Sequence, residues 1–190
     1  MDLKKKLRKQ GLEARRSLDP ALRRAYSAAI SEKLISSPYF LRASTIMLYR
    51  AMPDEADLSA VAEAAASSGK KVCYPKVKDR DSMEALCPLP GSDTVAGPFG
   101  IPEPDPAASE PVPPGEIGLV ICPCTVFDDA CGRIGMGGGY YDRFLPLCRN
   151  AAVVAAAFDC QKAPAVPCCG TDIRMDAVFT ETAVYPSGAV

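Results

Sequence analysis

The 190-residue sequence contains no histidine. This absence removes the commonest general base, the imidazole metal ligand and every Ser-His or Cys-His nucleophile pair, so it disfavours hydrolysis by proton shuttling. The formal net charge is only -1, with a pI near 5.6, and so gives no general attraction to nucleic acid or anionic membranes. No apolar run approaches membrane-spanning length, and the basic N-terminus lacks the apolar core of a signal peptide. We therefore expect a cytoplasmic protein that binds neither nucleic acid nor membranes.

Cysteine, by contrast, is abundant, with nine residues. The number is odd and no export signal is present, so reduced thiols are expected rather than a disulfide framework. Cys122-Pro123-Cys124 and Cys168-Cys169 lack the two-residue spacing of structural zinc sites, and we do not expect them to bind metal. In Cys122-Pro123-Cys124 the thiols are expected to serve as small buried apolar side chains.

The length and the 48% hydrophobic content predict one domain over residues 1–190. A basic helical segment of about residues 2–36 is expected to pack on it. Its first helix has Asp2 as a candidate N-cap, and its second begins at Asp19-Pro20 and continues to Pro38. A charge run such as Lys4 to Arg8 is most often a solvated helix face, and periodicity alone does not distinguish that role from ligand binding.

Short apolar runs then predict buried strands at 45–49, 71–75, 119–122, 152–158 and 178–180, with a further strand at 83–86. A helix that Asp57 could cap lies between the first two strands and makes them a βαβ unit. The loop after Tyr49, which contains Glu55, would then lie at the carboxyl edge of the sheet, where open α/β sheets bind ligands. The Pro- and Gly-rich segment 88–115 is either an ordered lid or a passive spacer.

Residues 132–139, the glycine loop, hold five glycines in eight positions between a predicted strand and a helix. Such backbone can turn several N–H groups toward one anion, which favours a phosphate site over a flexible linker. The loop lacks the Gly-Lys-Ser/Thr ending of a P-loop, and Tyr140 stands where a dinucleotide fingerprint needs glycine. The cations must therefore come from Arg133 and from Lys4 or Arg8. Asp172 and Asp176 could coordinate a cation or cap turns.

Five stretches together carry a family resemblance that covers nearly the whole chain. They are Lys4-Lys5-Lys6-Leu7-Arg8, Met52-Pro53-Asp54-Glu55, Tyr74-Pro75-Lys76, Phe99-Gly100-Ile101-Pro102-Glu103-Pro104 and Arg133 through Asp142. In this order the sequence resembles the 5-formyltetrahydrofolate cyclo-ligase family, also called 5,10-methenyltetrahydrofolate synthetases. The resemblance implies an α/β fold, a three-layer sandwich around a mostly parallel sheet with Rossmann-like open topology.

The resemblance also implies an activity, an ATP-dependent and Mg²⁺-dependent closure of 5-formyltetrahydrofolate to 5,10-methenyltetrahydrofolate. Transfer of the γ-phosphoryl group to the formyl oxygen would give an iminium phosphate, which N10 attacks before phosphate leaves, with ADP as the other product. Catalysis of this kind depends on positioning and charge neutralisation, so it does not need histidine. The expected substrate is 5-formyltetrahydrofolate, with or without a polyglutamate tail, and the expected state is a monomer.

Residue roles follow from the same resemblance. Arg133 and Tyr140 are the expected catalytic residues, and Asp142 and Asp172 the magnesium ligands, with Asp176 as a competing choice because Thr171 stands where many relatives have histidine. The expected folate contacts are Arg50, Glu55, Met136 and Tyr140. The expected ATP contacts are Lys4, Lys5, Lys6, Leu7, Arg8, Arg133, Ile134, Gly135, Met136, Gly137, Gly138, Gly139, Tyr140 and Tyr141.

Two other functions are compatible with the residues. A phosphosugar isomerase or acyl-CoA transferase on a similar frame would use the glycine loop to hold a phosphate without hydrolysing ATP. A non-enzymatic nucleotide or folate sensor would bind without turnover. ADP release in step with product distinguishes the cyclo-ligase from both.

Overall fold

The computed structural model describes residues 3–92 and 94–186 of the chain. The proposed N-cap Asp2 lies outside the described residues. None of the described helices is both long and apolar enough to cross a membrane.

A mixed sheet runs through the middle of the molecule, in the order β12-β11-β10-β7-β1-β2-β3-β6. The five strands from β11 to β2 are parallel to one another, and antiparallel strands extend the sheet on both sides. This arrangement confirms the expected α/β class and mostly parallel sheet. The strand bounds are β1 Thr45–Met47, β2 Lys71–Val77, β3 Met83–Pro88, β6 Ser109–Val112, β7 Leu119–Pro123, β10 Ala152–Ala156, β11 Ala177–Phe179 and β12 Val184–Pro186.

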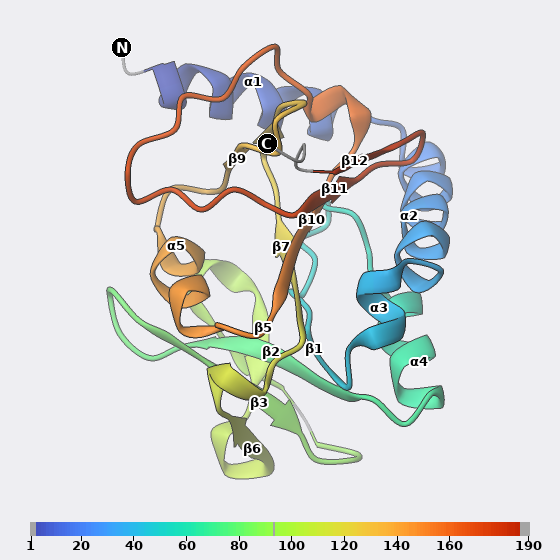
Figure 1. The fold of residues 1–190 in the computed structure, drawn as a ribbon, viewed down its shortest axis with the longest axis vertical. Helices are drawn as coiled ribbons and strands as arrows, with labels where there is room; N and C mark the ends of the chain where they lie inside the picture. The colour runs from blue at the N-terminus through green and yellow to red at the C-terminus, as the bar shows by residue number, and fades with distance from the viewer. Residues whose placement is uncertain (1–2, 93, 187–190) are drawn as a thin grey trace.

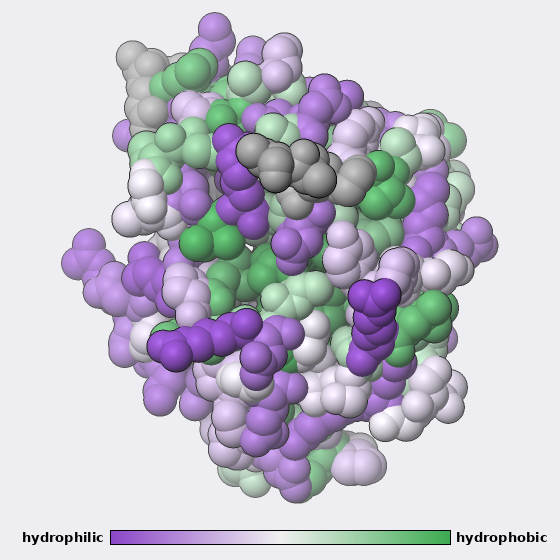
Figure 2. Space-filling view, in the orientation of Figure 1, coloured by the Kyte–Doolittle hydropathy of each residue, from purple (hydrophilic) through white to green (hydrophobic). Residues whose placement is uncertain are grey.

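Helices lie on both faces of this sheet and give it its layers (Figure 1). The side chains of Ile46, Leu119 and Val154 pack into one apolar cluster with α2, α3 and α4, whereas Met47 and Val120 point into the opposite cluster beneath α5. This alternation follows from the period of two along a strand. The helix bounds are α1 Leu3–Arg16, α2 Pro20–Ile35, α3 Pro38–Arg42, α4 Ser59–Ser67 and α5 Tyr140–Phe144. With the cores buried, the surface in this view is largely hydrophilic with small apolar areas (Figure 2).

The N-terminal helices begin and end largely where the sequence signals stand. The Asp19 carboxylate accepts hydrogen bonds from the Ala21 and Leu22 N–H groups, and Pro20 occupies the first helical position of α2. The second helix ends at Ile35, and Pro38 starts the separate helix α3 with Ser37 as its N-cap. The sequence reading missed α3, because proline is as well suited to the first turn of a new helix as to the end of an old one.

The predicted βαβ unit is confirmed, with β1 and β2 parallel and α4 between them. The prediction for its cap is off by one residue, since Leu58 rather than Asp57 occupies the N-cap position of α4. Asp57 still accepts a hydrogen bond of 3.0 Å from the Ser59 N–H. The turn is therefore stabilised by a local Asx contact just ahead of the helix.

Segment 88–115 is folded back on the sheet edge. It contains the hairpin of β4 (Thr94–Ala96) and β5 (Pro102–Pro104), then β6, with short 3₁₀ turns between them. Glu103 is buried and accepts hydrogen bonds from Lys76 Nζ at 2.7 Å and from the Val77 N–H at 3.3 Å. These contacts attach the segment to β2.

Helix α1 lies across the carboxyl ends of β1 and β7, at the top of Figure 1. Its Gly11 approaches the backbone after β7 so closely that an added Cβ would lie 2.3 Å from the Thr125 carbonyl oxygen. Only glycine permits this approach, which lets α1 contact the hairpin of β8 (Val126–Phe127) and β9 (Arg133–Ile134).

Candidate active site

A cavity of about 810 Å³ opens between α1, the loop after β1, the glycine loop and segment 98–103. It lies at the carboxyl ends of β1 and β7, as expected for an open α/β sheet. It contains most of the predicted site, brought together from four parts of the chain. The predicted residues that line it are Lys4, Arg8, Arg50, Glu55, Arg133, Ile134, Gly135, Met136, Gly137, Gly138, Gly139, Tyr140, Tyr141, Asp142 and Asp172.

Three predicted ATP contacts do not line this cavity. Lys5 and Lys6 are exposed on α1. Leu7 packs against a small apolar cluster that includes Val126 and Ile134. The basic run is thus divided by helical geometry, because Lys4 and Arg8 are four residues apart on one face and the residues between them point elsewhere.

The glycine loop has the geometry of an anion site. Gly137 has φ of 106° and Gly139 has φ of 69°, conformations that side-chain-bearing residues rarely adopt. Among the described residues, no acceptor pairs with the backbone N–H groups of Gly137, Gly138 or Gly139. A Cβ on Gly137 would lie 3.3 Å from the Arg8 guanidinium carbon, and Arg8 Nε donates to the Gly135 carbonyl at 2.8 Å. The loop therefore presents unused donors beside a fixed cation.

Arg133 supplies a second cation from within the protein. Its side chain is 3% exposed, and its Nη2 lies 3.3 Å from Asp142 Oδ1. The Nη1 atom donates to the Pro123 carbonyl at 3.3 Å, whereas the buried Nε has no partner among the described residues. A Cβ on Gly135 would lie only 2.8 Å from Nη1, so glycine there leaves room for the guanidinium.

The two predicted magnesium carboxylates line one wall. Asp142 accepts from Arg133 and, at 3.4 Å, from the Ile173 N–H. Asp172 pairs with Lys4 Nζ at 2.5 Å and accepts from the Cys169 N–H. Burial opposes ionisation of Asp172, but the hydrogen bonds from Cys169 and Lys4 outweigh it and lower its pKa.

Asp176, the competing choice, does not line the cavity. Its carboxylate accepts a hydrogen bond of 2.7 Å from the Val153 N–H and so ties the chain to β10. The described residues hold no cluster of three or more possible metal ligands. Asp142 and Asp172 suit Mg²⁺ only with phosphate oxygens completing its shell, which is how Mg²⁺ commonly binds in nucleotide enzymes.

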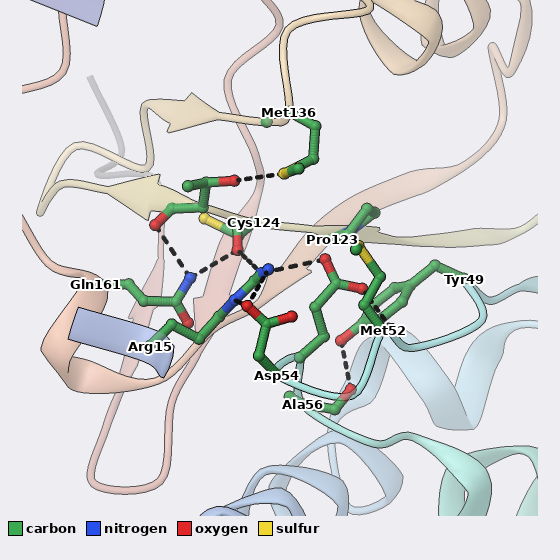
Figure 3. A network of polar contacts seen from close by, with 12 residues as sticks. Arg15, Tyr49, Met52, Asp54, Ala56, Pro123, Cys124, Met136 and Gln161 are labelled. Carbon is green, nitrogen blue, oxygen red and sulfur yellow. Dashed lines mark hydrogen bonds and ion pairs between the residues drawn. The ribbon is translucent and has the colours of Figure 1, made fainter. Parts of the chain in front are cut away.

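Glu55 also lines the cavity and is held by Arg15, whose guanidinium lies beside Asp54 and Cys124 in Figure 3. Its Oε1 accepts from Arg15 Nη1 at 3.1 Å, and its Oε2 accepts from the Met52 N–H at 3.0 Å. Burial raises the pKa of this carboxyl, and the Met52 and Arg15 contacts lower it only in part. Each oxygen keeps a second lone pair for a ligand.

Sequence reasoning missed Arg15 as part of this site. Arg15 is 1% exposed, and it also binds Asp54 at 3.1 Å and the Cys124 carbonyl at 3.4 Å. A signal was present, since Lys4, Arg8 and Arg15 stand at helical spacing on one face of α1. Glu103 was missed as well. It lines the cavity from segment 98–103, but this segment is far in sequence from the other residues of the site.

Arg50 lies between this cavity and a second one of about 950 Å³ on the side of α2 and α4. Its guanidinium carbon lies 4.3 Å from the centre of the Tyr74 ring, and its buried Nε has no partner among the described residues. The stacked ring fixes the guanidinium while leaving donors for an anion.

All nine cysteines are unpaired. Burial raises the pKa of Cys122 and Cys124 to about 12, so these thiols remain neutral in the core.

The cavity combines a glycine-rich loop beside Arg8 and Arg133, the carboxylates of Asp142 and Asp172, and the buried Glu55, at the place where open α/β sheets commonly bind small molecules. These features define the class as an α/β protein with a small-molecule site. Comparison with known families makes this specific. The profile of the 5-formyltetrahydrofolate cyclo-ligase family matches residues 1–181, and the chain belongs to that family of enzymes.

Relatives and solved structures agree with this assignment. The chain is 27% identical over 177 residues to the 5-formyltetrahydrofolate cyclo-ligase of Escherichia coli K12, covering 91% of this chain and 97% of the relative. The mouse enzyme of that name is 25% identical over 189 residues, covering 91% and 93%. The structure of Aquifex aeolicus 5,10-methenyltetrahydrofolate synthetase superposes with a TM-score of 0.85 at 29% identity, covering 99% of this chain and 94% of that one.

Proposed function

We propose that this protein closes 5-formyltetrahydrofolate to 5,10-methenyltetrahydrofolate at the expense of ATP, releasing ADP and phosphate. One observation carries the proposal. A single cavity is lined both by the glycine loop with Arg8 and Arg133 and by the buried Glu55 carboxylate. Its volume of about 810 Å³ lies in the upper part of the roughly 300–1,000 Å³ range of small-molecule sites.

Glu55 is suited to recognise the pterin ring. Its two oxygens are held by Arg15 and the Met52 N–H, so the carboxylate is fixed in direction. Its remaining lone pairs can accept paired hydrogen bonds from a ring N–H and an amino group. Met136, within the glycine loop, and Tyr140, directly after it, line the same cavity as Glu55 and are proposed folate contacts.

ATP is proposed to bind at the glycine loop, with the free N–H groups of Gly137 to Gly139 directed at its phosphates. Lys4 and Arg8 supply positive charge from α1, and Arg133 supplies it from β9. Asp142 and Asp172 would hold Mg²⁺ against the phosphate oxygens, which provides the charge neutralisation that phosphoryl transfer requires. Lys5, Lys6 and Leu7 remain predicted ATP contacts at the edge of this region.

The residues then act by positioning. Arg133, with its unpaired Nε, stabilises negative charge that develops as the formyl oxygen takes up the phosphoryl group. Tyr140 is held at its hydroxyl by the Asp79 carbonyl at 3.3 Å and presents its ring to the cavity. The substrate nitrogen N10 attacks the iminium phosphate so formed, and departure of phosphate completes the ring.

The Arg50 guanidinium is proposed to bind carboxylates of the glutamate tail of folate. The adjoining second cavity leaves room for a polyglutamate chain. Action as a monomer in the cytoplasm is part of the proposal, and the nine free thiols suit a reducing compartment.

A coupled assay tests the proposal. Purified protein with 5-formyltetrahydrofolate and Mg-ATP should form the methenyl chromophore and ADP in equal amounts. Product without ADP would indicate another reaction class, and tight binding of both ligands without product would indicate a sensor. Either result would refute the proposed reaction.

A further inference from the structure

Three residues that line the cavity each carry a buried polar atom without a hydrogen-bond partner among the described residues. These atoms are Arg50 Nε, Arg133 Nε and the Tyr141 hydroxyl. A buried polar group without a partner costs free energy, so its presence in a cavity wall points to a ligand that supplies the partner. The two arginines already have proposed roles. The resemblance predicts Tyr141 as an ATP contact but gives its hydroxyl no role.

Helix α5 separates the side chain of Tyr141 from that of Tyr140. The two tyrosines are the first residues of α5, and successive side chains on a helix point in different directions. The Tyr140 hydroxyl reaches the Asp79 carbonyl at 3.3 Å. The Tyr141 ring packs against the core cluster that contains Cys122, and the guanidinium carbon of Arg133 lies 5.7 Å from its centre. These contacts hold the Tyr141 ring and leave its hydroxyl unused.

The Tyr141 hydroxyl lies near two residues with different proposed roles, since Arg133 and Glu55 both act on it electrostatically. Glu55 is proposed to hold the pterin ring, and Arg133 is proposed to stabilise charge at the formyl oxygen. The formyl group is attached to N5 of that ring system, so its carbonyl must lie within reach of Arg133. A tyrosine hydroxyl is protonated at neutral pH and can donate to such a carbonyl.

We propose that the Tyr141 hydroxyl donates a hydrogen bond to the formyl oxygen of bound 5-formyltetrahydrofolate and so orients this oxygen for phosphoryl transfer. A carbonyl oxygen has two lone pairs, so the bond from Tyr141 occupies one and leaves the other to attack the γ-phosphorus of ATP. Fixing the oxygen in this way contributes to the rate through orientation. The inference rests on the proposed function and makes Tyr141 a catalytic residue beside Arg133.

Stability of the unliganded protein gives the first test. Tyr141→Phe removes a hydroxyl that has no partner, so the urea midpoint should stay unchanged or rise. Tyr49→Phe is the matched control, because the Tyr49 hydroxyl donates to the Ala56 carbonyl at 2.7 Å (Figure 3). The midpoint of this control should fall by roughly 0.5 M. An equal fall for Tyr141→Phe would reveal a structural partner for the hydroxyl and overturn the inference.

Binding of two folates gives the second test. 5-Methyltetrahydrofolate carries a methyl group at N5 and so offers no carbonyl there. Tyr141→Phe should weaken binding of 5-formyltetrahydrofolate about fivefold or more, and binding of the 5-methyl compound and of Mg-ATP less than about twofold. The value of kcat/KM for 5-formyltetrahydrofolate should fall by at least the same factor as the affinity.

The outcomes separate this inference from the proposed function. Equal weakening of both folates by Tyr141→Phe, or unchanged affinity for 5-formyltetrahydrofolate, would overturn the role of the hydroxyl, while turnover by wild-type protein would still support the proposed function. If wild-type protein binds no 5-formyltetrahydrofolate, the proposed function fails and this inference is overturned as well.

Discussion

Replacing Arg15 by alanine should destabilise the fold more than any exposed substitution on α1. Arg15 is 1% exposed and neutralises the Glu55 and Asp54 side chains, which are 6% and 13% exposed. Removing one partner of a buried ion pair leaves an uncompensated charge and typically costs about 3–5 kcal/mol. Asp54 keeps a contact with Arg16 at 3.4 Å, so we expect about 3 kcal/mol, the lower end of that range.

Urea denaturation measures this cost. With a slope of roughly 2–3 kcal/mol/M, the midpoint should fall by about 1–1.5 M without a change in slope. Arg16→Ala is the matched control, because Arg16 binds the same Asp54 but is 62% exposed, and it should change stability by about 0.5 kcal/mol or less. The double variant Arg15→Met/Glu55→Gln should recover at least about 1 kcal/mol, since it removes the stranded carboxylate as well.

The cost should also depend on pH. Without Arg15, Glu55 can escape its unpaired charge by binding a proton, so the loss should shrink from pH 8 toward pH 5. A loss below about 1 kcal/mol for Arg15→Ala, or one equal to that of Arg16→Ala, would refute the assignment of Arg15 as the buried counter-charge.

Three further predictions concern the site. Glu55→Ala should weaken folate binding about tenfold or more with little effect on ATP binding, and Arg133→Ala should weaken ATP binding with little effect on folate binding. Titration of each variant with each ligand measures these effects. Equal effects on both ligands would contradict the proposed roles of Glu55 and Arg133. Asp142→Asn should raise the magnesium concentration needed for half-maximal rate, whereas the control Asp176→Asn should leave it unchanged. An equal increase in both variants would contradict the assignment of Asp142 rather than Asp176 to the metal site. The folded-state pKa of Glu55 is raised above 4.5, so protonation of Glu55 stabilises the fold, and this contribution is lost as pH rises from 4.5 through the raised value. In urea denaturation at stepped pH, the free energy of unfolding of wild type minus that of Glu55→Gln should therefore fall over this window. A difference that does not change with pH would contradict the raised pKa.

The sequence predicted the fold well because its signals are local. Apolar runs at 119–122 and 152–158 became the central strands β7 and β10, and the Asp19-Pro20 pair started α2. Element ends were less accurate, as α3 and the cap of α4 illustrate, since proline and the Asx residues serve several neighbouring positions equally well.

Residues of a continuous motif in the candidate site could be predicted from the sequence. The prediction was incomplete where the site is assembled from distant segments. The glycine loop, Asp142 and Glu55 line one cavity, as expected. Arg15 and Glu103 lie far in sequence from their partners, and no local pattern encodes a contact across 40 or more positions such as Arg15 to Glu55. The sequence likewise did not show that the Asp176 carboxylate accepts a hydrogen bond from the Val153 N–H of β10, whereas Asp172 lines the cavity.

Helix α1 is synthesised before the residues with which it makes its tertiary contacts. Gly11 needs the backbone at Thr125, Arg15 needs Asp54 and Glu55, and Lys4 needs Asp172. Loop closure over such separations is slow, and α1 has few early partners. During synthesis α1 therefore stays undocked as a basic segment, and the cavity becomes complete only after Ile173, its last lining residue, has emerged.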